Sequence, residues 1–222
     1  MTIIFMIYAA AIAFGVRTLI WRYGTPRLRI VGIPLVAIWF IGTLVLGATG
    51  KLGDPEAFPP GMLKIILPII LLWVSILASN WGKQFSSAVP IALLTGVQAF
   101  RVPVEFFIHH LVEMKLMPEM MTWTGANFDI VTGLTAPLMA AWILNGKAPR
   151  WALVAWNLAG MALLLNVVVR GVLSAPGPQQ MILTDVPNVA VTQFPWVEIP
   201  ALFVALAGAL HLLSLRKLSR KI

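Results

Sequence analysis

The chain has 222 residues, of which 59% are hydrophobic and only 11% are charged, and its mean hydropathy is +0.90. This composition excludes an ordinary soluble domain and indicates a polytopic membrane protein. Because the sequence contains no cysteine, disulfides, thiolate catalysis and thiolate metal sites are excluded. The formal net charge is +8, which raises the question of what the basic residues face.

Seven apolar runs are long enough for a helix to cross about 30 Å of hydrocarbon, which takes roughly 20 residues. The first run begins at Met1 and carries Arg17 and Arg22 at its far end. This is the reverse of a secretory signal, so we predict a retained span. The sequence predicts an all-α, polytopic membrane bundle of seven transmembrane helices in one domain, residues 1–222, with spans near 3–21, 29–49, 62–80, 87–112, 126–145, 151–173 and 195–215.

Lysine and arginine are distributed unequally between the two sides of the predicted bundle. The larger group comprises Arg22, Arg27, Arg29, Lys83, Lys147, Arg150, Arg216, Lys217, Arg220 and Lys221, and the smaller group Lys51, Lys64 and Lys115. By the positive-inside rule, the amino terminus is predicted outside and the carboxyl terminus in the cytoplasm. The expected partners of the basic collar are anionic lipid headgroups rather than nucleic acid.

The fourth predicted span carries the clearest functional signal, because ionisable side chains are costly at membrane depth. At about 100° per residue its polar side chains fall within an arc of about 80°, so one helix face is polar. The next spans are expected to add polar side chains at the same outer layer of the membrane. The predicted site therefore comprises Gln98, Arg101, Glu105, His109, Asn127, Asp129, Asn166 and Arg170.

Five of these residues also have a purely structural interpretation. Arg101 and Glu105 are four residues apart and could form a neutral pair that only permits burial. Asn127 could cap the fifth span, and Asp129 would then lie at the positive end of its helix dipole. Arg170 could extend to the lipid headgroups.

A metal site is a minority alternative. Glu105 and His109 project together at i and i+4, and Asp129 or Glu198 could complete a set of nitrogen and oxygen ligands. Arg101 on the same stripe argues against a divalent cation, because its fixed charge would need further carboxylates to offset it. We therefore predict no metal.

The segment between the last two predicted spans is unusually apolar for an external loop. Prolines 176, 178, 187 and 195 make a regular helix improbable there. Long irregular loops often serve as lids or binding elements. We expect this segment to fold over the outer mouth of the bundle, with Trp196 at the membrane interface.

From about residue 98 onward the chain resembles a family of uncharacterised bacterial integral membrane proteins. The resemblance is carried by the runs F-R-V-P-V-E, M-T-W-T-G-A-N-F-D-I-V-T-G-L-T-A, A-L-L-L-N, L-S-A-P-G-P and L-H-L-L-S-L-R-K-L. It covers a little over half of the chain. It implies the seven-helix architecture and a place in the bacterial inner membrane, and it adds no reaction.

Three functional hypotheses follow. The leading one is a polar, ionisable site in the outer half of the bundle that binds a small polar or amphiphilic ligand or relays protons, as a transporter would. The second is an intramembrane hydrolase or lipid-modifying enzyme, with or without a metal, in which Glu105 or Asp129 is the base and His109 the acid. The third is an assembly subunit whose buried charges fix helix register. No cofactor or oligomeric state is indicated.

Overall fold

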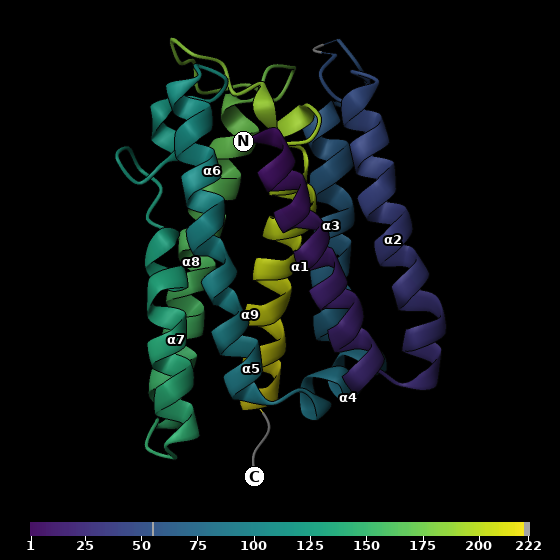
Figure 1. Ribbon diagram of the computed structural model, residues 1–222, viewed down its shortest axis with the longest axis vertical. Coiled ribbons are helices and arrows are strands. Elements are labelled where there is room, and N and C mark those ends of the chain that lie inside the picture. The colour runs from purple at the N-terminus through teal and green to yellow at the C-terminus, as the bar shows by residue number, and fades with distance from the viewer. Residues whose placement is uncertain (55, 220–222) are drawn as a thin grey trace.

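The computed structural model describes residues 1–54 and 56–219 (Figure 1). Arg220 and Lys221, which belong to the larger basic group, lie outside the described residues. Every regular element in the described residues is helical. The helices are α1 (Thr2–Tyr23), α2 (Pro26–Ala48), α3 (Gly61–Ala78), α4 (Asn80–Ala88), α5 (Ile91–Gly96), η1 (Val97–Phe100), α6 (Arg101–Glu113), η2 (Glu119–Met121), α7 (Ile130–Leu144), α8 (Arg150–Ser174), η3 (Ala190–Thr192), η4 (Ile199–Val204) and α9 (Ala205–Leu218).

Six helical segments of the described chain are long and apolar enough to cross a membrane. They are α1, α2, α3, the segment α5–η1–α6, α8 and the segment η4–α9. The all-helical, multi-pass membrane prediction is therefore confirmed. The fifth predicted span, 126–145, differs: its helix α7 has only 15 residues and begins at Ile130.

Helix α7 starts late because polar side chains fold the chain before it into turns. The backbone N–H of Asp129 donates to Asn127 Oδ1 at 2.9 Å, and the N–H of Asn127 donates to the carbonyl of Thr122 at 3.3 Å. Such local hydrogen bonds compete with the helical pattern. Irregular backbone is tolerated at membrane depth where protein surrounds it, and Asn127 is buried.

The short helix α4 was not predicted. Pro90 separates it from α5, and Ser79 caps its start by accepting from the N–H of Gly82 at 3.2 Å. In Figure 1, α4 lies at the same end of the bundle as the α1–α2 turn, the α7–α8 turn and the end of α9. The described residues of the larger basic group therefore lie together at this end, and the N-terminus lies at the opposite end.

Helix α9 occupies the centre of the bundle, whereas α1 and α2 lie at its periphery. In an apolar stretch of 18 residues in η4–α9, 67% of the residues are buried. The corresponding fraction is 11% in α1 and in α2. The N-terminal hairpin is attached near one end. Tyr8 donates its hydroxyl proton to the carbonyl of Phe100 at 2.6 Å, and the Trp39 indole N–H donates to the carbonyl of Ala201 at 2.9 Å.

The loop between α8 and η4 is irregular, as predicted, apart from the single turn η3. It is joined to the neighbouring loop by the N–H of Ala190, which donates to the carbonyl of Leu116 at 3.2 Å. Trp196, which was expected at the membrane interface, is covered by protein. Its ring is 6% exposed and its centroid lies 4.6 Å from that of Phe5, because the end of α1 covers it.

Close packing of α3 against α9 yields the first prediction. A Cβ atom at Gly208 would overlap the indole of Trp73, whose N–H is held by the carbonyl of Ala205 at 3.1 Å. We expect Gly208→Ala to lower stability by about 1–3 kcal/mol through overpacking. The measurement is the midpoint of thermal unfolding in detergent. The matched control is Gly42→Ala in α2, where no atom lies within 4 Å of a new Cβ, and an equal effect of both changes would contradict this reading.

Candidate functional site

A buried ion pair joins the fourth span to the start of α7. Arg101 Nη1 donates to Asp129 Oδ1 at 2.8 Å, and the two residues are 2% and 8% exposed. Arg101 is the first residue of α6, and Asp129 directly precedes α7. The Nε and Nη2 atoms of Arg101 are buried without a hydrogen-bond partner. The pair therefore leaves part of the guanidinium available to another group.

Asn127 organises the second carboxylate of the site. Its amide nitrogen donates to Glu105 Oε1 at 2.8 Å and to the carbonyl of Met121 at 2.9 Å, while its oxygen accepts from the N–H of Asp129. The Asn127 side chain thus fixes the position of Glu105 and the turn that places Asp129 next to Arg101. The other carboxylate oxygen, Glu105 Oε2, is buried without a partner.

Arg101, Glu105 and Asp129 line a common cavity of about 30 Å³. Its remaining wall is apolar and comes from η1, α6, α8 and η4–α9, including Leu164, Phe203 and Ala207. A void of this size has room for a water molecule or two but for no larger organic ligand. If all three ionisable groups are charged, the cluster carries a net negative charge away from bulk water, and one bound proton would neutralise it.

Asn166 and Arg170 support the site from α8 without lining the cavity. Asn166 donates its amide to the carbonyl of Ala126 at 2.9 Å, next to Asn127 in the chain. Arg170 Nε donates to the oxygen of Asn166 at 2.9 Å. These two residues hold the irregular turn in place, which is a positioning role.

The two ends of the predicted stripe lie away from the cavity. Gln98 is buried, and its amide donates to the carbonyl of Ala207 at 3.2 Å. His109 is half-buried, with its ring stacked on Trp123 at 4.5 Å and its Nδ1 3.4 Å from the hydroxyl of Thr122. The structure therefore brings together Arg101, Glu105, Asn127 and Asp129, and it separates the rest.

The four candidate metal ligands do not form a set. Glu198 is fully buried elsewhere, where its Oε1 accepts from the hydroxyl of Thr43 at 2.5 Å, and His109 faces Trp123. Within the part of the chain that the structure describes, no three His, Asp or Glu side chains are arranged so that they could hold a metal ion. The geometry gives the metal alternative no support.

A second buried polar pair, between α8 and α9, was not predicted as part of a site. His211 Nδ1 lies 2.9 Å from Asn157 Oδ1, and the Asn157 amide nitrogen donates to the carbonyl of Leu153. This assigns the proton to Nδ1, so Nε2 is the acceptor nitrogen, and it has no partner. Gly160 makes room for the ring, because a Cβ there would lie 2.6 Å from Nε2. The sequence signal was a histidine and an asparagine at similar depth in two predicted spans.

The ion pair carries the second prediction. Asp129→Leu leaves the Arg101 guanidinium buried without a counter-charge, and we expect a loss of about 3–5 kcal/mol in stability. Arg101→Met combined with Asp129→Leu removes both charges and should recover most of that loss. Unfolding midpoints in detergent for the two single variants and the double variant test this expectation.

A matched control for this cycle is Glu113→Leu, since the Glu113 side chain is 63% exposed and lies 3.8 Å from two histidines. Exposed pairs contribute little, so this change should have a small effect. Additive effects of the Arg101 and Asp129 substitutions would show that the two residues are not coupled.

Most of the chain matches a known protein family. A family model described as "Domain of unknown function (DUF8737)" matches residues 60–219, which run from α3 to α9 and contain the whole candidate site. No curated protein and no solved structure matches the chain.

Proposed function

The chain belongs to the DUF8737 family, a domain of unknown function, and we propose that in this multi-pass membrane protein the cluster of Arg101, Glu105 and Asp129 binds and releases protons. The observation that carries the proposal is the cavity of about 30 Å³ that these three residues share. Unpartnered atoms of Arg101 and Glu105 are buried beside it, so a water molecule would find both a donor and an acceptor there.

The small size of the cavity favours proton exchange over ligand binding and over enzymatic catalysis at this site. A polar or amphiphilic ligand needs a pocket of some hundreds of Å³. A hydrolase or lipid-modifying enzyme must also hold the reacting bond of its substrate against the base. Protons carried by water need only a small void with groups that can change charge.

Buried polar groups extend from the cluster toward the end of the bundle that holds the C-terminus. Ala207 lines the cavity, and His211 lies one turn further along α9 with its Nε2 unpartnered. Gln98, one turn before Arg101, also has an unpartnered oxygen. In this proposal His211 is the next group to accept a proton, because imidazole exchanges protons at either nitrogen.

His109 supplies the step toward the opposite surface. It lies one turn after Glu105 on α6, and its side chain is 33% exposed. A group that is partly exposed and one helical turn from the buried carboxylate is suited to pass protons between it and external water. The relay therefore has a candidate group on each side of the cluster.

The orientation belongs to the same proposal. We infer seven passages through a bacterial inner membrane, with α7 and the turn before it as the fifth passage. The end that carries α4 and the described basic residues faces the cytoplasm, by the positive-inside rule. The N-terminus and His109 then face outside.

The third prediction tests the proton site. Glu105→Gln keeps an oxygen for Asn127 and removes the group that changes charge, so proton flux across proteoliposomes should fall at least tenfold. A pH-sensitive dye trapped inside the vesicles measures the flux. The control is Glu119→Gln, an exposed carboxylate in η2. Flux that is unchanged in a correctly folded Glu105→Gln protein would reject the site.

The fourth prediction tests orientation, for which the absence of native cysteine is an advantage. We place single cysteines at exposed loop lysines, Lys51→Cys between α2 and α3 and Lys147→Cys between α7 and α8. A membrane-impermeant maleimide should label Lys51→Cys in intact cells and Lys147→Cys only after permeabilisation. The reverse pattern would invert the assignment.

A further inference from the structure

A large apolar crevice separates the N-terminal hairpin from the rest of the bundle. It has a volume of about 770 Å³ and is continued by a cavity of about 300 Å³. The residues that line both cavities come from α1, α2, α3 and α9 and are Val16, Leu35, Val36, Leu72, Leu206 and Ala209. All are apolar, so the crevice suits hydrocarbon rather than a polar molecule.

The crevice follows from the way the hairpin is attached. The contacts described above anchor it near the N-terminus of α1, through Phe5 and Tyr8, and in the second half of α2, through Trp39 and Thr43. The residues of α1 and α2 that line the larger cavity lie between these anchors and the α1–α2 turn. There the hairpin meets α3 and α9 across the crevice instead of packing tightly against them.

The end of the crevice near the α1–α2 turn is polar. Thr25, Arg27, Asn80 and Gln84 line it there. Arg27 is exposed, and among residues 1–54 and 56–219 no carboxylate forms an ion pair with it. A cation that faces a crevice without a counter-charge is complementary to an anion.

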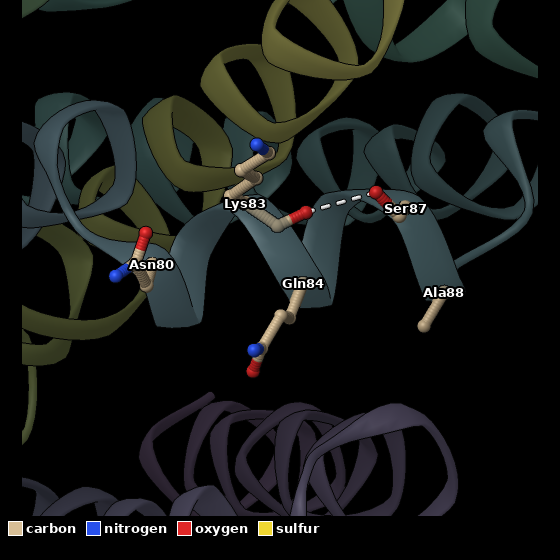
Figure 2. A pocket seen from close by; sticks show the side chains of 5 residues that line it. All are labelled: Asn80, Lys83, Gln84, Ser87 and Ala88. Atoms are coloured by element: carbon tan, nitrogen blue, oxygen red, sulfur yellow. Dashed lines mark hydrogen bonds between the residues drawn. The ribbon is translucent and has the colours of Figure 1, made fainter.

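An open surface depression of about 540 Å³, lined mostly by polar residues, adjoins this end. It is lined by α4 residues, among them Asn80 and Gln84, which also line the apolar crevice. Figure 2 shows Gln84 pointing toward the purple ribbon of the N-terminal helices, whereas Lys83 points toward α9. Ser87 donates its hydroxyl proton to the carbonyl of Lys83 at 2.9 Å, the dashed line of Figure 2. The polar depression and the apolar crevice share two residues, so together they match the polar headgroup and the apolar chains of an amphiphile.

We propose that this crevice binds one anionic phospholipid. Its acyl chains lie between the hairpin and α3–α9, and its phosphate lies at Arg27 with Asn80 and Gln84 as hydrogen-bond donors. Within a bilayer the chains gain little by moving from lipid to an apolar crevice, because lipid tails are as apolar as leucine. The headgroup therefore determines which lipid binds, and its negative charge is what Arg27 selects.

The lipid site is independent of the proton site. Helix α9 lies between them: Ala207 borders the ionisable cluster, whereas Leu206 and Ala209 border the crevice. The family match begins at residue 60, so one wall of the crevice comes from the matched region and the other from the hairpin before it.

Native mass spectrometry of the purified full chain tests the proposal, with phosphatidylglycerol and phosphatidylcholine added in equal amounts. The wild type should retain one phosphatidylglycerol about tenfold more than phosphatidylcholine. Arg27→Gln should reduce this preference to near equality. The control Arg150→Gln removes an exposed arginine from the first turn of α8, outside the crevice, and should keep the preference.

Filling the crevice should abolish retention of either lipid. Ala209→Phe does this from α9, and Val36→Phe does so from α2 if the first variant fails to fold. The control Ala141→Phe adds the same ring to an exposed position of α7. Retention by a folded crevice variant, equal behaviour of the two arginine variants, or a lipid-free dimer that closes the crevice would overturn the proposal.

Discussion

A guanidinium in the interior of a membrane protein requires a counter-charge, and meeting this requirement shapes the middle of the bundle. Arg101 is placed in the core by the apolar residues around it, so Asp129 must reach it from the next segment, at 2.8 Å. The chain before α7 consequently enters as turns, and those turns carry Asn127 to Glu105. The short α7, the presence of two carboxylates at one site and the small cavity between them all follow from this one ion pair.

Helix α9 gives the bundle two different environments. One of its faces, with Ala207 and His211, borders the ionisable cluster and the buried pair with Asn157. Another, with Leu206 and Ala209, borders the apolar crevice beneath the hairpin. The helix is preceded by the π-helical turn η4, a feature often found near functional sites. The proposed proton site and the proposed lipid site therefore share no residue.

Within the predicted polar stripe, Arg101 and Glu105 lie at the common cavity whereas Gln98 and His109 do not line it, and the reason is geometric. The prediction assumed a regular α-helix, but Val97–Phe100 is a 3₁₀ helix, in which successive residues turn further about the axis. This turn brings Gln98 nearly into line with Arg101 rather than with Glu105, because residues three apart eclipse in a 3₁₀ helix, and the Gln98 amide donates to the carbonyl of Ala207 in α9. At the other end, His109 is drawn to Trp123, a residue of a loop whose path no local pattern specifies.

The sequence by itself determined the membrane class, the positions of most apolar helices and the residue types of the buried site. These properties depend on hydrophobicity and on spacing along one chain segment, which are local. Only the tertiary structure decided which polar groups meet, that Glu198 pairs with Thr43 and that Trp196 is buried under α1. It also decided that the hairpin leaves a crevice. Such outcomes depend on contacts between segments far apart in sequence, and a periodic pattern within one helix carries no information about its neighbour.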